Sequence, residues 1–191
     1  MKFAVIVVDM LKDTYDSPST HRFMKDFRDI IPGIRNLAGE ARKRGGLIVY
    51  ANDSYLREDF LFRGKMKHTA IRGTRGAEVI DELPVLESDI VLPKRRFSAF
   101  FKTDLDMTLR TLRIDTIAVT GLTTEVCVLS TVLDGLANDF NSVLISDCCA
   151  SRSRETHDAV VAAFSRFPTY PTLRVRTAEE FLAEAGEEAV L

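Results

Sequence analysis

Three residues whose side chains could act together on a carbonyl compound each follow a short apolar run of the chain: Asp9, Lys94 and Cys127. A thiolate is a strong nucleophile, a carboxylate can take the proton of a thiol, and an ammonium group can hold that carboxylate ionised and oriented. Taken singly, each also has an ordinary structural interpretation. Asp9 could cap a turn, Lys94 could be a solvated lysine in the basic run KRR, and Cys127 could pack as a small apolar side chain. Their common position favours the joint interpretation, nucleophilic attack by a thiol.

The surroundings of Cys127 predict a strand followed by a helix. The β-branched run at residues 116–120 is too short for a helix and is typical of a buried strand. Gly121 ends it, and Thr123 and Thr124 offer side-chain oxygens that could cap the helix predicted beyond them. Cys127 would then lie in the first helical turn, where free N–H groups and the helix dipole favour a thiolate. We therefore expect a lowered pKa for this thiol.

Apolar runs and amphipathic segments alternate along the whole chain. We predict strands at residues 3–8, 47–50, 90–92, 116–120, 142–146 and 173–175. We predict helices at residues 26–44, 78–83, 105–112, 155–167 and 178–185, besides the one that carries Cys127. Residues 10–21 and 55–77 lack a clear periodicity, so we predict loops there, the second a long functional loop or lid.

This alternation predicts an α/β protein. We expect a three-layer α/β/α arrangement around a mostly parallel, about six-stranded, Rossmann-like sheet, in a single domain over residues 1–191. The continuous apolar run at residues 3–8 is typical of a central strand covered on both faces. The carboxyl ends of parallel strands share one edge, where ligands of open α/β sheets bind. Asp9, Lys94 and Cys127 are therefore expected to converge at that edge.

The composition is that of an ordinary globular protein. The 191 residues are 46% hydrophobic and 28% charged, which suits one domain with a substantial core. The net charge of −2 gives no reason to expect nucleic acid or an anionic membrane as a partner. No apolar run approaches the roughly 20 residues that span a membrane, and Asp9 interrupts the first run too early for a signal peptide. Three cysteines without zinc-like spacing fit a reducing compartment, so we expect a cytoplasmic protein.

Five segments together resemble a known family, the isochorismatase-like cysteine hydrolases, which include nicotinamidases, N-carbamoylsarcosine amidases and ureidoacrylate-type amidohydrolases. The matching segments are VIVVDM at 5–10, GTRGAEVIDEL at 73–83, LPKRRFSAFFKTDLD at 92–106, GLTTEVCVLSTVLDGL at 121–136 and SDCCASRSRETHDAV at 146–160. The spacing of the strand-end Asp, the Lys before FSAF and the T-x-x-C-V pattern is specific. The resemblance covers essentially the whole chain.

The resemblance implies a catalytic triad of Asp9, Lys94 and Cys127. It also implies a cis peptide between Leu122 and Thr123, with the backbone N–H groups of Thr123 and Cys127 as donors to an oxyanion. The expected reaction is hydrolysis of a C–N bond in a small amide, carbamoyl or ureido compound through a thioester. The expected partner is this small-molecule substrate, no cofactor is expected, and we expect a homo-oligomer.

Two other functions remain open. Vinyl-ether hydrolysis of isochorismate needs an acid but no thiol, so the presence of Cys127 argues against it. An inactive member kept as an oligomeric scaffold or small-molecule binder would have no need of the complete triad.

The chain departs from the pattern of the metal-binding members of this family. Those members carry a D-x-H pair and a second His before the GTxGAE segment, whereas here Asp53 is followed at the His position by Tyr55. His68 lies near the position of the second His, one residue farther from Gly73. Imidazole is a far better zinc ligand than a neutral phenol. We therefore expect no metal, with Asp53 and His68 as the first ligands to test if one binds.

Other residues near the expected pocket have weaker assignments. Leu11 stands where many members have Gln, and Asp13 matches an acid of the family that would bind substrate or cap a turn, the second role being favoured. Phe97, like Phe100 and Phe101, would line the pocket, pack in the core or contact another subunit. Tyr55 is also assigned to the pocket.

The remaining histidines and cysteines are given structural roles. His21 and His157 are predicted to be surface residues of helices. Cys148 and Cys149 are predicted to be buried at a strand end rather than to act in redox chemistry, because adjacent cysteines rarely form a disulfide.

Overall fold

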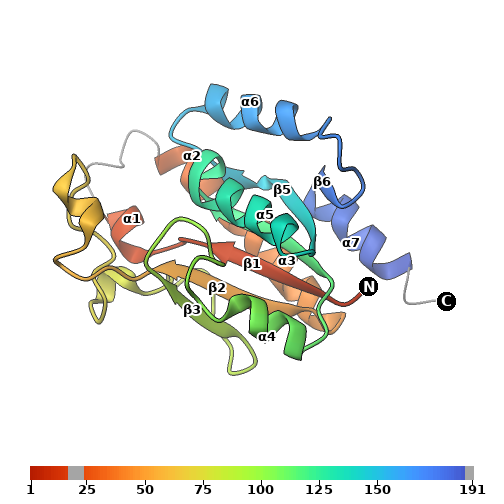
Figure 1. Ribbon diagram of the computed structural model, residues 1–191, viewed down its shortest axis with the longest axis horizontal. Coiled ribbons are helices and arrows are strands. Elements are labelled where there is room, and N and C mark those ends of the chain that lie inside the picture. Colours follow the sequence, from red (N-terminus) through yellow and green to blue (C-terminus); the bar gives the residue numbers. More distant parts are fainter. Residues whose placement is uncertain (17–23, 188–191) are drawn as a thin grey trace.

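The computed structural model describes residues 1–16 and 24–187, and its centre is a six-stranded sheet in which every strand pairing is parallel (Figure 1). The strands are β1 (Phe3–Val8), β2 (Leu47–Asp53), β3 (Ile90–Lys94), β4 (Thr116–Leu122), β5 (Asn141–Ala150) and β6 (Leu173–Arg176). The α-helices are α1 (Lys12–Asp16), α2 (Met24–Asp29), α3 (Ile31–Lys43), α4 (Leu105–Thr111), α5 (Leu129–Ala137), α6 (Arg154–Phe164) and α7 (Ala178–Glu187). Three single turns are the 3₁₀ helices η2 (Phe60–Arg63) and η3 (Arg75–Ala77) and the π-helical turn η4 (Thr124–Val128). None of the helices in the described ranges is long and apolar enough to cross a membrane.

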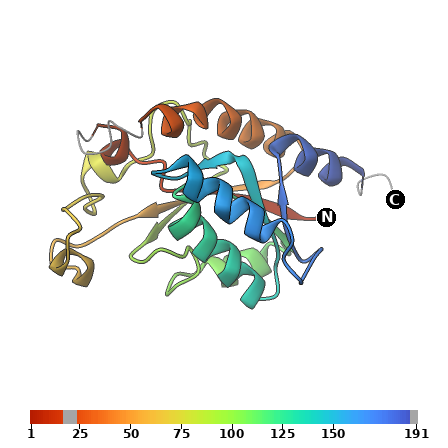
Figure 2. The ribbon, with the colours of Figure 1, turned by 90° about the horizontal axis from the view of Figure 1, so that it is seen from above.

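β1 is a central strand, and all six of its residues are buried. Its odd-numbered side chains pack in the core cluster that α3 and α7 complete, and its even-numbered side chains pack in the cluster that α4 and α5 complete. Figure 2 shows α3 and α7 on one side of the sheet and α4, α5 and α6 on the other. The two cores confirm the predicted three-layer α/β/α fold, with a sheet that is entirely parallel.

The strand order β3-β2-β1-β4-β5-β6 places the change of chain direction between β1 and β4. The chain first builds outward from β1 to β3 and then returns to the other side of β1. This is the strand order of the Rossmann type, whose ligands bind at the carboxyl ends of the strands beside the switch point. Asp9 and η4 directly follow these two strands.

The predicted helix at residues 78–83 is wrong. Val79 forms an antiparallel bridge with Leu11, and Ile80 donates its N–H to the carbonyl of Met10 at 3.0 Å. Residues 78–80 are therefore held in an extended form against the chain that leaves β1, and residues 81–83 form a turn in which Leu83 donates its N–H to the carbonyl of Ile80 at 3.1 Å. This tertiary pairing supplies backbone hydrogen bonds that a single helical turn would have made locally.

Several predicted bounds also change. The helix predicted at 26–44 is interrupted at Ile30, and Pro32 lies in the first turn of the second part, where proline is favoured. Lys12–Asp16 forms α1 within the loop predicted at 10–21, whose residues 17–21, with His21, lie outside the described ranges. β5 continues to Ala150, past its predicted end.

Candidate active site

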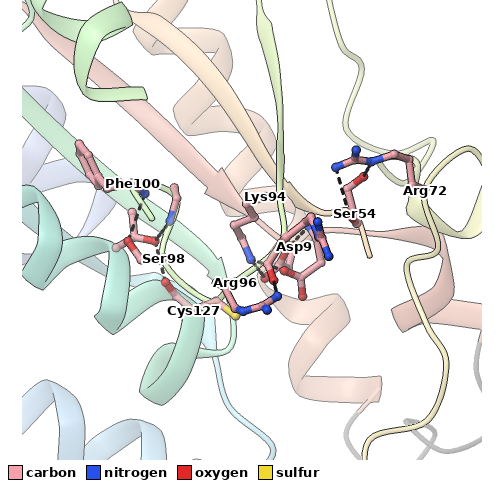
Figure 3. Close-up of polar contacts among 12 residues, drawn as sticks. Asp9, Ser54, Arg72, Lys94, Arg96, Ser98, Phe100 and Cys127 are labelled. Carbon is pink, nitrogen blue, oxygen red and sulfur yellow. Dashed lines mark hydrogen bonds and ion pairs between the residues drawn. The ribbon is translucent and has the colours of Figure 1, made fainter. Parts of the chain in front are cut away.

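Asp9, Asp53 and Lys94 form a buried ion cluster at the carboxyl edge of the sheet, and Figure 3 shows Lys94 directed toward Asp9. Lys94 Nζ lies 2.9 Å from Asp9 Oδ2 and 2.5 Å from Asp53 Oδ1, and the Lys94 side chain is 0% exposed. Asp9 Oδ1 accepts the backbone N–H of Asp53 at 2.8 Å. Ion pairs thus connect the carboxyl ends of β1, β2 and β3. The sequence analysis missed Asp53 as a partner of Lys94, although its position after an apolar strand run could have indicated it.

The backbone around Asp9 aims its carboxyl group at this cluster. Asp9 has a φ of 53°, in the left-handed region that few residues other than glycine adopt. Its N–H donates to the carbonyl of Ala51 at 3.1 Å, which holds the residue against β2. On the other side, Gly121 (φ 105°) lets β4 approach β1, because a Cβ there would lie 2.1 Å from the carbonyl oxygen of Val8.

Cys127 lies in the π-helical turn η4, directly after β4. Its Sγ and carboxylate oxygens of Asp9 and Asp53 all lie within 4.8 Å of one another, so the thiol joins the ion cluster. The peptide between Leu122 and Thr123 is cis. The Thr123 carbonyl then accepts the N–H groups of Val126 and Val128, at 3.1 and 3.2 Å.

The predicted caps of this turn are not formed. Thr123 occupies the N-cap position without a side-chain hydrogen bond to the turn, and Thr124 Oγ1 instead pairs with His157 Nδ1 at 2.9 Å. The His157 side chain is buried, so the prediction of a surface histidine is wrong. It packs from α6 onto the turn that carries Cys127, a tertiary contact that the amphipathic pattern of α6 does not reveal.

The predicted lowering of the Cys127 pKa is also wrong. Burial raises the pKa of the Cys127 thiol well above its usual range, and the Asp9 charge adds to this, while Lys94 opposes it. The sequence argument considered only the helix N-terminus and could not include the loss of water around the thiol. Cys127 is therefore protonated at neutral pH.

The pKa values of Asp53 and Lys94 are both raised, which favours the neutral form of the acid and the charged form of the amine. Burial and the neighbouring Asp9 charge raise the pKa of Asp53 to about 6, although Lys94 partly opposes them. Burial alone would lower the pKa of Lys94, but the charges of Asp9 and Asp53 outweigh burial and raise it. The lysine thus remains a fixed cation, while Asp53 can change its protonation near neutral pH.

Arg95 and Arg96, the two cations next to Lys94 in the chain, bind elsewhere. Arg95 Nη2 and Arg96 Nη1 lie 2.6 and 3.2 Å from Asp59 Oδ1. Asp59 also accepts the N–H of Leu56, and the hydrogen bond from Arg95 is the main reason that the pKa of Asp59 is lowered to about 2. These contacts fasten the segment at 55–77 to the chain after β3. Asp59 was not singled out by the sequence analysis.

The residues around Asp53 do not fit the metal site of the family's metal-binding members. Asp53 Oδ1 is occupied by the Lys94 ammonium group, which would repel a cation. Tyr55 is fully buried, and burial raises its pKa above the usual range, so it presents a neutral phenol. His68 is exposed and its ring packs edge-on against Phe62. In the described ranges, the group of close metal-ligand atoms comprises Asp9, Asp53 and Cys127, without His68.

The other residues assigned to the pocket lie in different settings. Asp13 Oδ2 accepts the N–H of Ala70 at 2.7 Å, which ties α1 to the segment at 55–77. Phe97 is exposed, whereas Phe100 is buried and packs against Phe140. Cys148 and Cys149 are buried free thiols within β5, as predicted.

Comparison with known proteins agrees with this architecture. A protein-family model described as the isochorismatase domain matches residues 3–180 of this chain. An isochorismatase-like hydrolase from Alkaliphilus metalliredigens superposes with a TM-score of 0.85 at 31% identity, over 96% of this chain and 99% of that one. The N-carbamoylsarcosine amidase from Thermoplasma acidophilum gives 0.82 at 29% identity, over 94% and 98% of the two chains.

A relative from Arabidopsis thaliana is described as a probable inactive nicotinamidase. It is 32% identical over 166 residues, which are 82% of this chain and 84% of the relative. The matched family model spans both ends of the sheet and all of the residues that build the ion cluster and the thiol turn. The chain therefore belongs to the isochorismatase family of hydrolases.

Proposed function

We propose that this protein hydrolyses a C–N bond of a small amide, carbamoyl or ureido compound, with Cys127 as the nucleophile and Asp9 as the acid and base. The observation that carries the proposal is the burial of a lysine ammonium group between two carboxylates, with a thiol sulfur within 4.8 Å of their oxygens. Burying charges is costly unless they are paired, so such a cluster is typical of a site where the charges are used.

In the first half of the reaction, Asp9 takes the proton from Cys127 Sγ as the sulfur bonds to the substrate carbonyl carbon. A base is needed because the thiol is protonated at neutral pH. The tetrahedral oxyanion accepts hydrogen bonds from the backbone N–H groups of Thr123 and Cys127. When it collapses, the C–N bond breaks, Asp9 returns the proton to the leaving nitrogen, and a thioester remains on Cys127.

In the second half, water attacks the thioester carbon and gives a proton to Asp9. The C–S bond then breaks, the sulfur regains that proton, and a carboxylic or carbamic acid leaves. Asp9 acts as a base and an acid once in each half, and Lys94 keeps its carboxyl group oriented throughout.

Two alternatives predict different behaviour. A vinyl-ether hydrolase would use the acid and leave Cys127 without a role. An inactive member, as the Arabidopsis relative is described, would release no product from any compound. Asp9, Lys94 and Cys127 lie together in this chain, which supports activity over both alternatives.

The test is ammonia release from a panel of primary amides and ureides by wild type, Cys127→Ala and Cys148→Ala. We expect Cys127→Ala to abolish release with its fold intact, because one small side chain replaces another. Cys148→Ala is the matched control and should retain it, since that thiol lies in the core on the α3 side of the sheet. Retained turnover in Cys127→Ala would show that Cys127 is not the nucleophile. In a separate experiment, acid quenching of wild type during turnover should trap an acyl adduct on Cys127.

A further inference from the structure

The hydroxyl group of Tyr55 is buried without a hydrogen-bond partner. Among the described residues, the buried side-chain polar atoms in this condition are Tyr55 Oη and Asn52 Oδ1. A buried hydroxyl that makes no well-formed hydrogen bond has lost its hydration without full compensation, so such a group calls for an explanation. Tyr55 itself is 0% exposed.

The backbone directs Tyr55 to the same side as Asp53. The chain continues in extended form beyond β2, with Tyr55 paired to Ile71 in a parallel bridge and its N–H bonded to the carbonyl of Ala70. Side chains two residues apart in extended chain point to one face, so Tyr55 lies on the face where Asp53 meets Lys94. Asn52 points to the other face. The Tyr55 ring is fixed edge-on against Phe62 at 5.5 Å between ring centres.

The charges around the hydroxyl indicate what it would bind. Burial raises the pKa of Tyr55 most, and the charges of Asp53, Asp9 and Cys127 add to this, so the hydroxyl stays protonated. The hydroxyl lies beside Asp53 and lowers the pKa of that acid, although the two groups do not meet the distance and angle of a well-formed hydrogen bond. A ligand group beside two carboxylates is attracted if it carries N–H donors and repelled if it carries a second anion.

We propose that the Tyr55 hydroxyl is a specificity-determining group of the active site, whose oxygen accepts an N–H of the amide or ureido nitrogen of the substrate. The inference rests on the proposed function and names the nitrogen side of the substrate as the part that Tyr55 recognises. A site with an unsatisfied buried polar group discriminates strongly against compounds that cannot pair with it, since they leave it unpaired. Esters of the same shape would therefore be disfavoured.

The experiment compares two alkylating probes of Cys127, iodoacetamide and methyl iodoacetate. Both lose iodide to the thiolate, but only the first carries N–H groups. Mass spectrometry of the peptide that contains Cys127 gives each rate for wild type and Tyr55→Phe. We expect the ratio of the iodoacetamide rate to the ester rate to fall about three- to tenfold in Tyr55→Phe, the effect of one neutral hydrogen bond.

Tyr50→Phe is the matched control. Tyr50 is a buried residue of β2, the strand that precedes Tyr55, but its hydroxyl donates to the carbonyl of Pro84 at 3.2 Å, on the other side of the sheet. Tyr50→Phe should lower the Tm and leave the ratio of rates unchanged. Tyr55→Phe should keep or raise the Tm, because it removes an unsatisfied polar atom.

The outcomes separate the inference from the proposed function. An unchanged ratio in Tyr55→Phe, or a loss of Tm as large as that in Tyr50→Phe, would overturn the role of Tyr55 alone. Ammonia release by Cys127→Ala would overturn the proposed function, whatever the ratio of alkylation rates.

Discussion

At the scale of single residues, the site is defined by one lysine that two carboxylates share. Lys94 is the cation of the cluster, because Arg95 and Arg96 are bound to Asp59. Its ammonium group lowers the pKa of Cys127, whereas burial and the charges of Asp9 and Asp53 raise it. The position of this single charge therefore controls how readily the thiol can be deprotonated.

Lys94→Met keeps the aliphatic stem and removes the charge. We expect turnover to fall by roughly two or more orders of magnitude, the scale of losing one preorganised charge. The pH dependence of Cys127 alkylation should move to higher pH, because the thiolate loses its only nearby cation in the cluster. Rates of alkylation between pH 6 and 10 would measure this shift.

Arg96→Met provides the control for this change. Arg96 contacts Asp59 rather than Asp9, so its loss should leave the alkylation profile in place. If the alkylation profile moved in Arg96→Met and stayed fixed in Lys94→Met, the charge that acts on Cys127 would come from Arg96 and our assignment of Lys94 would be wrong.

At the scale of elements, the turn η4 is held from three sides. Thr124 Oγ1 pairs with His157 of α6, and Ser151 Oγ donates to Glu125 Oε2 at 2.5 Å. On the third side, Thr131 Oγ1 donates to the carbonyl of Cys127 at 2.7 Å. These contacts fix a π-helical turn whose backbone must hold both the thiol and the proposed oxyanion donors.

Thr124→Val removes the hydroxyl that pairs with His157 and leaves a buried ring nitrogen without this partner. We expect a loss of about 1–3 kcal/mol in the free energy of unfolding, measured with urea. We also expect a lower kcat with little change in KM, because the turn that carries Cys127 is no longer fixed. Thr124→Ser should restore both quantities.

If Thr124→Ser were as impaired as Thr124→Val, the hydroxyl would not be the group that matters. Thr111→Val, which removes the hydrogen bond of an exposed threonine to the carbonyl of Met107, should change neither quantity by a comparable amount.

At the scale of the whole molecule, the active-site cluster imposes a pH dependence on stability. The pKa of Asp53 is about 6 in the folded protein, above the value of about 3.9 for an unperturbed aspartate. The folded state therefore holds this proton more tightly than the unfolded state does. Stability from Asp53 is fully present below about pH 4 and is lost as the pH rises through 6.

The homo-oligomeric state and the cytoplasmic location remain predictions at this scale. Analytical ultracentrifugation would test the oligomeric state.

Asp53→Asn removes this dependence. We expect the free energy of unfolding of wild type, relative to Asp53→Asn, to decrease by about 1–3 kcal/mol between pH 4 and pH 7. Urea unfolding of both proteins at each pH would show the trend. A difference that stays level or increases over this range would contradict the raised pKa.

Asp59→Asn is a control of opposite sign. The pKa of Asp59 is lowered to about 2, so its stabilising effect is present above about pH 4 and is lost as the pH falls through 2. The difference between wild type and Asp59→Asn should therefore be level between pH 4 and pH 7.

The sequence by itself determined the layers of the fold and the strand ends at which chemistry is placed. Residues 3–8 form an unbroken apolar run because both faces of β1 are covered, and they are a strand with the predicted bounds. Asp9 and Lys94 could be placed at the carboxyl edge because parallel strands share that edge, whatever their order. These features depend on local periodicity, which the sequence displays directly.

The tertiary structure alone decided the charge states and the partners. Asp53 and Lys94 are 41 residues apart, Asp9 and Lys94 are 85 apart, and Thr124 and His157 are 33 apart, so no local pattern records their contacts. The Cys127 pKa followed burial rather than the helix terminus, since the water removed by distant elements outweighs a partial charge nearby. The segment at 78–83 does not form a helix, because the chain after β1 pairs with Glu78 and Ile80 in extended form. Desolvation and pairing act across space, and they became fixed only when the strands assembled.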